Sequence, residues 1–344
     1  MMKLKRVSRR SFASALATLG LFALGTAGGA SGALAQSKEV TFAHQDMQVP
    51  FRVLMESGEI EKATGYKVKW RQFGGGGDVI RAMASGDVQI GEAGSSPIAA
   101  AVSQGQDIKL FWILDDIADA EALIVREGSG ITDLKGLVGK RVATPFVSTS
   151  HYQLMVGMKL AGVDTRKVNV MNMRPPEIAA AWERGDIDAA FIWDPILSKI
   201  KGNGKMIASS GTIGAQGHPT FDGIVVNAKW AAENEAFMVT LVKLLAKYDA
   251  EYRANVDKWT ADSPQIKAVA KWSKAEPKMI PPAMRLYKLP SLEEQASEAW
   301  LGGKAAVALK NTAEFLKEQG RVQAVKADYA PYVTTEYVKK AMGK

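Results

Sequence analysis

Two short polar segments have the residue types of an anion-binding helix start. Gly94-Ser95-Ser96-Pro97 and Ser148-Thr149-Ser150-His151 each place hydroxyl groups and free backbone N–H groups where a helix is predicted to begin. A helix N-terminus also carries a partial positive charge, so it can hold an oxyanion without a charged side chain. Each segment alone could be an ordinary N-cap, but two such segments favour a ligand site.

A second group of polar residues stands where predicted strands should open on a cleft: Gln45, Glu121, Asp194 and Asp222. Glu121 and Asp222 each precede an apolar, strand-like run. A carboxylate in that position suits an ammonium group, although each acid alone could be a solvated turn residue. Trp193, beside Asp194, could wall an apolar slot, offer a cation–π face or belong to the core.

The sequence lacks the residue patterns of the common catalytic sites. It has no cysteine, and its histidines at positions 44, 151 and 218 do not have the spacing of a zinc site. It also contains no nucleophile elbow, and the glycine run at 74–77 lacks the Lys-Ser or Lys-Thr of a phosphate-binding loop. We therefore expect a protein that is not an enzyme and needs no cofactor or metal.

The N-terminal residues 1–35 have the pattern of an export signal. The basic start ends in Ser8-Arg9-Arg10-Ser11-Phe12, which is similar to a twin-arginine signal, and Ala33-Leu34-Ala35 is a small-x-small cleavage site. We expect cleavage near Ala35 and a periplasmic location, with general secretory export as the alternative route. This leader holds five basic and no acidic residues, so the net charge of +8 falls to +3 without it. An interspersed surface of that charge gives no reason to expect a nucleic-acid partner.

Segments of strand and helix character alternate along the rest of the chain. Period-two runs such as 66–70 predict strands, and segments such as 79–85 predict helices between them. This alternation is typical of an α/β fold with largely parallel sheets. Beyond residue 228 the pattern is mostly helical, with helical segments predicted over 231–254, 264–273 and 291–319.

One arrangement occurs twice in the sequence. Residues 82–90 and 180–189 each predict a helix end, a Gly-Asp turn and a strand, and each leads to a proline, Pro97 or Pro195, that should start the next helix. In open α/β sheets, ligands bind at the carboxyl ends of the strands. The repetition favours two similarly wound lobes that face each other across a cleft, with chance likeness of two α/β units as the alternative.

Several longer motifs make the sequence similar to the periplasmic taurine-binding proteins of ABC transporters. They lie at residues 84–97, 145–152, 175–188 and 312–320, and the likeness runs over about residues 38–337. The wider group includes binders of alkanesulfonates, nitrate, bicarbonate and thiamine precursors.

The resemblance implies a type II periplasmic binding protein with two α/β lobes, each a mostly parallel sheet flanked by helices, and a ligand cleft between them. The chain would cross between the lobes twice, giving one lobe from 36–122 and 225–344 and another from 123–224. The resemblance also implies that the protein delivers taurine or a related sulfonate to an ABC permease with a cytoplasmic ATPase. We expect it to act as a monomer.

The resemblance also implies roles for the candidate residues. The sulfonate group would meet hydroxyls and the histidine of the two helix starts, namely Ser95, Ser96, Thr149, Ser150 and His151. The ammonium group would meet Glu121 and Asp222, with Trp193 as a wall and with Gln45 and Asp194 nearby. Taurine separates its two charges by about 5 Å, and the motif loops offer hydroxyls and acids but no arginine, which an α-amino-acid binder would use. Another alkanesulfonate or small zwitterion, or an enzyme of the thiamine-precursor type, are the alternatives.

Overall fold

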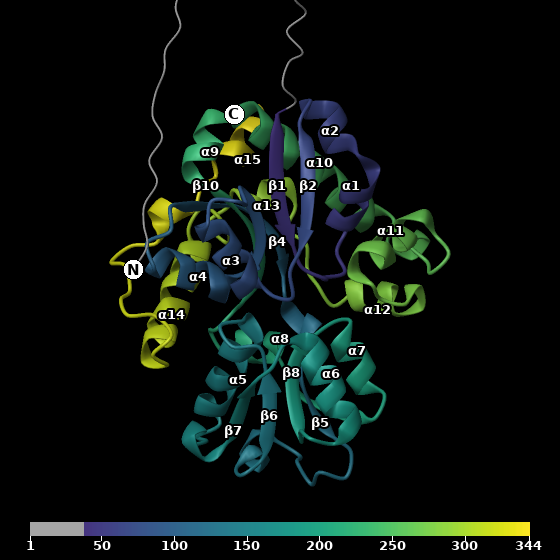
Figure 1. Ribbon diagram of the computed structural model, residues 1–344, viewed down its shortest axis with the longest axis vertical. Coiled ribbons are helices and arrows are strands. Elements are labelled where there is room, and N and C mark those ends of the chain that lie inside the picture. The colour runs from purple at the N-terminus through teal and green to yellow at the C-terminus, as the bar shows by residue number, and fades with distance from the viewer. Residues whose placement is uncertain (1–37) are drawn as a thin grey trace, which may run out of the picture. The chain divides into compact units, whose positions relative to one another are not determined.

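The computed structural model describes residues 38–344 (Figure 1). The predicted leader and its cleavage site near Ala35 lie outside the described residues. Within residues 38–344, no helix combines the length and the hydropathy needed to cross a membrane.

The first of two five-stranded sheets has the strand order β2-β1-β3-β10-β4. β1 pairs in parallel with β2 and β3, whereas β10 runs antiparallel to β3 and β4. The strands are β1 Glu39–His44, β2 Lys67–Gln72, β3 Ile90–Gly94, β4 Ile108–Asp116 and β10 Phe221–Asn227.

The second sheet has the order β7-β6-β8-β5-β9 and repeats this plan. β6 pairs in parallel with β7 and β8, and β5 runs antiparallel to β8 and β9. The strands are β5 Glu121–Arg126, β6 Arg141–Thr144, β7 Asn169–Asn172, β8 Ala189–Trp193 and β9 Gly204–Ser209.

Fifteen α-helices occur among residues 38–344, and they cover the sheets (Figure 1). Those that precede β10 in the chain are α1 Phe51–Ser57, α2 Glu59–Thr64, α3 Gly76–Ala84, α4 Ser95–Ser103, α5 Thr149–Leu160, α6 Pro175–Arg184, α7 Ile196–Lys201 and α8 Ser210–Gly214. Those that follow β10 are α9 Ala228–Glu233, α10 Glu235–Ala254, α11 Pro264–Ser273, α12 Ile280–Met284, α13 Leu292–Gln295, α14 Lys304–Glu318 and α15 Glu336–Ala341.

The α/β class with two sheets is confirmed, with one difference. The sequence predicts mostly parallel sheets, but each sheet holds two parallel and two antiparallel pairings. The antiparallel pairings in both sheets belong to β10 or β5, the strands with which the chain returns to the first sheet or enters the second. A strand that arrives from the other sheet is not bound by the βαβ crossover that makes neighbours parallel.

The strand β5 is covered by side chains on both of its faces. In β5, Leu123 and Val125 pack into the core on one face of the second sheet, whereas Ala122 and Ile124 pack into the core on the other face. Successive strand residues point to opposite faces, so a strand covered on both sides is apolar throughout. The side chain of Phe315 on α14 packs against both the first-sheet core and the core on one face of the second sheet.

The repeated arrangement is present in both sheets. α3–β3–α4 and α6–β8–α7 are each a helix, a strand and a helix, and β3 and β8 take the same third position in their sheets. The two prolines differ from the prediction because Pro97 is the third residue of α4, whereas Pro195 precedes the first residue of α7.

The helical segment predicted over 291–319 is not continuous in the structure. It is divided into α13 and α14, and residues 296–303 form turns between them. The Gly302 amide donates to the Ser297 carbonyl at 2.9 Å in this connection. Glycine is a weak helix former because its backbone loses the most conformational entropy on folding, so Gly302 and Gly303 favour a break there.

Candidate functional site

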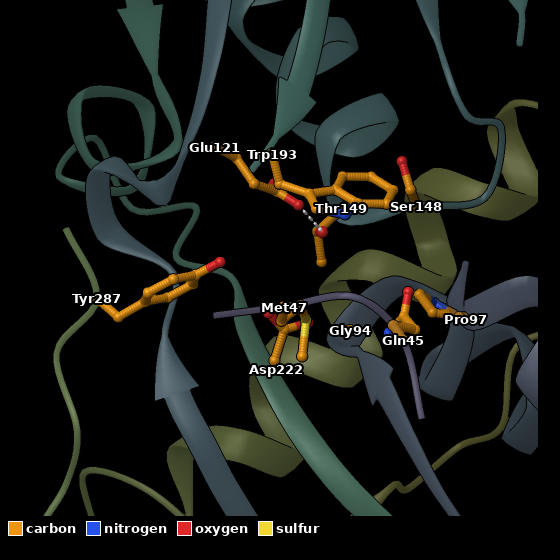
Figure 2. A pocket seen from close by; sticks show the side chains of 11 residues that line it. Gln45, Met47, Gly94, Pro97, Glu121, Ser148, Thr149, Trp193, Asp222 and Tyr287 are labelled. Atoms are coloured by element: carbon orange, nitrogen blue, oxygen red, sulfur yellow. Dashed lines mark hydrogen bonds between the residues drawn. The ribbon is translucent and has the colours of Figure 1, made fainter. Parts of the chain in front are cut away.

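A small cavity holds about 340 Å³ of open space and is lined by residues that belong to both sheets or follow their strands (Figure 2). Four lining residues belong to the second sheet or to the segment after β6. Glu121 begins β5, Trp193 ends β8, and Ser148 and Thr149 form the start of α5. The remaining ones come from the first sheet and its loops and helices, and they are Gln45, Met47, Gly76, Gly94, Pro97, Asp222 and Tyr287. Five of the ten predicted site residues therefore line this cavity: Gln45, Glu121, Thr149, Trp193 and Asp222.

Gly94 is the point where the two predicted anion-binding segments meet. A Cβ atom at this position would lie 2.8 Å from Thr149 Cγ2 and 3.2 Å from Asp222 Oδ1. Real Cβ atoms do not approach other atoms at 2.8 Å, so glycine is required for this close approach. The end of β3 thereby lies directly against the first residue of α5.

The start of α4 carries buried hydroxyl groups without partners. Ser95 and Ser96 are the first two residues of the helix, both are fully buried, and neither Oγ atom has a hydrogen-bond partner among the described residues. A buried polar group without a partner costs about 1–3 kcal/mol. Neither serine lines the cavity itself, but Gly94 and Pro97, which flank them, do. This helix start therefore has hydrogen-bonding capacity that the protein does not use internally.

The start of α5 is built differently. Ser148 is the N-cap, and its Oγ accepts a hydrogen bond from the His151 amide at 3.1 Å. The residue before it, Val147, has φ 68°, a left-handed conformation that is strained for a β-branched residue. Thr149 lines the cavity, whereas Ser150 is fully buried with its hydroxyl unpartnered.

The His151 ring is not among the groups that line the cavity. It stacks on Phe146 with ring centroids 4.6 Å apart and contacts the edge of Phe315. Burial and the nearby Arg321 guanidinium lower the pKa of His151 to about 4, so the ring is neutral at pH 7. A contact between this side chain and a ligand stays a prediction.

Two acids that line the cavity are buried and form no ion pair with a basic side chain among residues 38–344. Glu121 accepts hydrogen bonds from the hydroxyls of Thr149 at 2.6 Å and Ser210 at 3.1 Å. Burial raises the pKa of Glu121 to about 7, and these hydroxyls limit the rise. Burial, together with the negative charges of Glu121 and Glu92, raises the pKa of Asp222 well above its usual range. Both acids would be stabilised in their charged form by a cation in the cavity.

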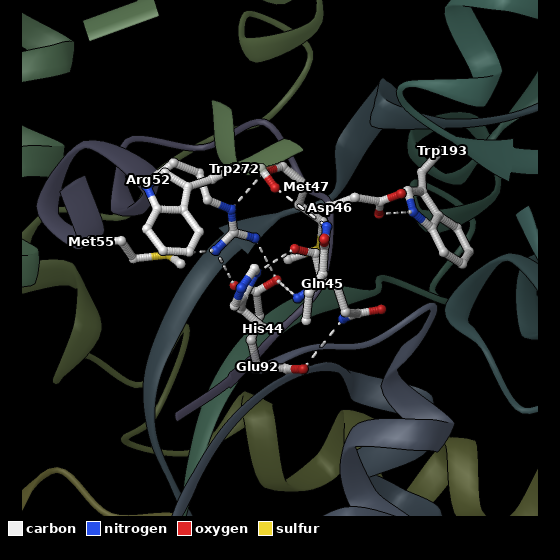
Figure 3. A network of polar contacts seen from close by, with 10 residues as sticks. His44, Gln45, Asp46, Met47, Arg52, Met55, Glu92, Trp193 and Trp272 are labelled. Carbon is white, nitrogen blue, oxygen red and sulfur yellow. Dashed lines mark hydrogen bonds and ion pairs between the residues drawn. The ribbon is translucent and has the colours of Figure 1, made fainter. Parts of the chain in front are cut away.

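A buried ion pair fixes the loop that brings Gln45 and Met47 to the cavity (Figure 3). Both guanidinium NH groups of Arg52 donate to the Glu92 carboxylate at 2.7 Å, and both side chains are fully buried. Glu92 Oε1 also accepts from the Gln45 amide at 3.1 Å, and Arg52 Nε donates to the Met47 carbonyl at 3.0 Å. A bidentate pair of this kind fixes both the position and the orientation of the loop.

Asp194 has a structural partner instead of a place in the cavity lining. Its carboxylate accepts a hydrogen bond from the Ser198 amide at 2.8 Å, in the first turn of α7. An acid at a helix N-terminus satisfies a free N–H group. The structure thus gives Asp194 a capping role, and its proposed contact with a ligand is not tested by the lining of the cavity.

Tyr287 and Met47 line the cavity, and neither was predicted as a site residue. Tyr287 lies between α12 and α13, and it is positioned by two backbone hydrogen bonds between its neighbour Lys288 and Asp116, of 2.8 and 3.0 Å. These partners are more than 170 residues apart in the chain, so no local pattern signals their contact. Met47 lies within a predicted loop, and its apolar side chain has no distinguishing spacing.

The described residues contain no group of three or more His, Cys, Asp or Glu side chains arranged to hold a metal ion. The chemistry available in the cavity is therefore that of hydrogen-bond donors, carboxylates and aromatic or apolar walls. Such an arrangement binds a small polar solute, and its buried acids favour a positive charge on that solute.

Comparison with known proteins agrees with this geometry. Residues 62–247 match the family described as NMT1/THI5 like. The taurine-binding periplasmic protein of Escherichia coli (strain K12) is 37% identical to this chain over 304 residues, which is 88% of this chain and 94% of that protein. The resemblance found in the sequence motifs is thereby confirmed.

Two solved structures show the same fold at lower identity. The periplasmic aliphatic sulphonate binding protein SsuA from Escherichia coli has a TM-score of 0.70 at 20% identity, covering 88% of this chain and 99% of that chain. The desulfurization enzyme DSZB has a TM-score of 0.62 at 13% identity, covering 89% and 99%. The fold thus occurs in binding proteins and in an enzyme. The chain belongs to the NMT1/THI5-like family, and its fold is that of a two-lobed periplasmic binding protein.

Proposed function

We propose that this protein is the periplasmic solute-binding component of an ABC importer and that it captures taurine. The observation that carries the proposal is the chemistry of the cavity. It brings together two helix starts that carry unpartnered hydroxyl groups and two buried acids, Glu121 and Asp222, that form no ion pair with the described residues. The taurine-binding relative supports the same ligand.

In this proposal the sulfonate group accepts hydrogen bonds at the starts of α4 and α5. The donors are the hydroxyls of Ser95 and Ser96 and the free backbone N–H groups in the first turn of α5, because the Thr149 hydroxyl is already bonded to Glu121. Helix N-termini suit this group because their N–H groups and partial positive charge need no counter-ion. The ammonium group then meets Glu121 and Asp222, which its charge would keep ionised. Trp193 and Tyr287 form the walls between the two ends.

We also propose that the two sheets mark two lobes, which lie close to the predicted segments 36–122 with 225–344 and 123–224, with all of β5 in the second lobe and all of β10 in the first. β5 and β10, which carry Glu121 and Asp222 at their first and second positions, are the strands nearest to both crossings. Delivery to a permease with a cytoplasmic ATPase, and action as a monomer, belong to the same proposal. A cavity held between two lobes requires that they separate for the ligand to leave.

A plain alkanesulfonate is the second candidate, since the structural neighbour SsuA is named for such ligands. It would use the same helix starts but would leave Glu121 and Asp222 buried without a counter-ion, which is costly. An enzyme of the DSZB type is less well supported, because the cavity lining has no cysteine, and its hydroxyls and acids form no nucleophile–base pair with a histidine.

A thermal-shift panel separates these candidates. The mature protein is first freed of co-purified solute by partial unfolding and refolding. It is then mixed with taurine, ethanesulfonate or β-alanine, each at millimolar concentration. At equal ligand concentration, a ligand that binds the folded state more tightly raises the unfolding midpoint further. We expect the largest rise with taurine. An equal or larger rise with ethanesulfonate would favour the plain alkanesulfonate, and consumption of taurine in the mixture, followed by mass spectrometry, would favour an enzyme.

A further inference from the structure

A second carboxyl group lies beside the cavity acid Asp222, on the neighbouring strand. Asp115 on β4 and Asp222 on β10 are opposite one another in the antiparallel register, and Asp222 is also opposite Gly94 on β3. Side chains directly opposite each other in antiparallel strands project from the same face, with Cβ atoms about 4.5–5.5 Å apart. The pairing of β4 with β10 therefore makes the two carboxyl groups neighbours.

Asp115 is more deeply buried than the acid that lines the cavity. Its exposed fraction is 0%, against 6% for Asp222, and neither of its carboxylate oxygens has a hydrogen-bond donor with acceptable geometry among the described residues. An ionised carboxylate without donors is very unfavourable in such a place. Asp115 has no part in the capture of taurine as described above. The presence of an acid at this buried position therefore needs a separate explanation.

In the part of the chain that the structure describes, the charged groups around the pair supply no free cation. Glu92 on β3, Glu121 on β5 and Asp116 on β4 face it with like charge, and the buried Tyr287 hydroxyl is close to both acids. Arg52 on α1 is the base that acts on Asp222, but both of its NH groups are bonded to Glu92. A free positive charge must therefore come from a ligand or from protons.

We propose that Asp115 and Asp222 hold a proton between them in the ligand-free protein, and that the ammonium group of the bound solute replaces this proton, which leaves to solvent. The inference rests on the proposed function, because it needs a ligand with a cationic end. Two close carboxyl groups that cannot both ionise are known to share a proton. In agreement, burial and mutual repulsion raise the pKa of both acids well above the usual range.

The proposal fixes the direction of the pH dependence. The pair binds a proton more tightly without ligand than with it, so ligand binding releases a proton and becomes stronger as the pH rises. The effect spans the range from the ordinary carboxyl pKa up to the raised pKa of the pair, below the pH at which an aliphatic ammonium group loses its charge. Release of one whole proton corresponds to a tenfold fall in Kd per pH unit.

The test is calorimetric titration of the ligand-stripped protein with taurine at pH 6, 7 and 8, in phosphate and in imidazole. These buffers differ in their heat of ionisation, so the difference in binding heat counts the protons released. We expect release that approaches one proton per taurine in the wild-type protein. In Asp115→Asn the amide can donate to Asp222 and keep it ionised, so we expect less than half of that release and a Kd that changes less than threefold between pH 6 and 8.

Asp249→Asn is the matched control. Asp249 on α10 is also a buried acid, and burial raises its pKa to about 8, but it does not line the cavity. This variant should release protons as the wild-type protein does. Taurine binding with equal heats in both buffers would overturn the inference while leaving the proposed function intact, and this result needs no variant. Full release in Asp115→Asn would also overturn it, since the proton would then come from another acid such as Glu121. No taurine binding at all would overturn the proposed function, and the inference with it.

Discussion

Trp193 Nε1 donates a hydrogen bond to Asp46 Oδ1 at 3.1 Å and thereby connects the two sheets beside the cavity (Figure 3). Trp193 ends β8 of the second sheet, whereas Asp46 lies in the loop that follows β1 of the first. Burial raises the pKa of Asp46 to about 6, and the Trp193 N–H limits the rise. The same loop carries Gln45 and Met47, so this contact couples the position of the second sheet to the lining of the cavity.

Removal of this donor should weaken taurine binding. Trp193→Phe keeps an aromatic wall but leaves the Asp46 carboxylate without its partner, which we expect to weaken taurine binding by about 1.5–3 kcal/mol, or roughly 10- to 150-fold. Calorimetry measures the affinity. Trp182→Phe is the matched control, because Trp182 donates its N–H to Asn203 at 2.7 Å without lining the cavity. Equal losses of affinity in both variants would contradict the coupling role of Trp193.

The two cavity acids should distinguish a zwitterion from a plain anion. We expect Asp222→Asn and Glu121→Gln each to weaken taurine binding by about 1–3 kcal/mol, because each removes a charged partner of the ammonium group. Binding of ethanesulfonate should be unchanged or stronger, since a buried negative charge is lost. Taurine affinity within twofold of wild type in both variants would show that the ammonium group lies elsewhere.

A single methyl group at Gly94 should disturb the cavity. Gly94→Ala would place Cβ 2.8 Å from Thr149 Cγ2, so β3 and α5 must move apart to accept it. Overpacking of this kind costs about 1–3 kcal/mol, and we expect weaker taurine binding to accompany the loss of stability. Gly75→Ala is the control, because nothing lies within 4 Å of a Cβ atom there. Normal affinity in Gly94→Ala would show that the close approach is not needed for binding.

The Arg52–Glu92 pair should dominate local stability. Arg52→Met leaves the Glu92 carboxylate buried without its counter-ion, and we expect it to lower the free energy of unfolding by about 3–5 kcal/mol. Urea denaturation provides the measurement. Adding Glu92→Gln to Arg52→Met removes the unpaired charge and should recover part of the loss. This explanation would be contradicted if the double variant lost more free energy of unfolding than the losses of the two single variants added together.

The buried Asp249 should make the stability of the ligand-free protein depend on pH. Burial raises the pKa of Asp249 from 3.8 to about 8, so the folded state holds its proton where the unfolded state has lost it. The stabilisation that this proton provides is complete below about pH 4 and is lost as the pH rises to about 8. Urea unfolding of Asp249→Asn between pH 5 and 8 should show a weaker fall in stability than the wild type. An identical fall would show that Asp249 ionises normally.

The sequence predicts the site best where function depends on local pattern. The helix starts at Ser95 and Ser148, and the acids beside the strands of Glu121 and Asp222, follow from residue type and strand period, and the structure brings the two segments together at Gly94. The repeated Gly-Asp turn likewise predicts the helix–strand–helix units around β3 and β8.

The parts that the sequence does not predict depend on contacts between distant segments. The pairing of Lys288 with Asp116 brings Tyr287 to the cavity. Asp115 lies beside a cavity acid only because β4 and β10 pair in a register that places it opposite Asp222. The side-chain direction of His151 is also set by tertiary packing, since its ring packs against the rings of Phe146 and Phe315. Sequence spacing gives the start of α5 but not which of its side chains face the cavity.

Calorimetric titration of the ligand-stripped mature protein with taurine at pH 7 tests the central claim most directly. The cavity that joins two helix starts to buried acids predicts saturable one-to-one binding with a Kd in the micromolar range or tighter. It also predicts binding at least tenfold weaker for ethanesulfonate, which lacks the ammonium group. No heat of binding and no thermal stabilisation at millimolar taurine would contradict the account.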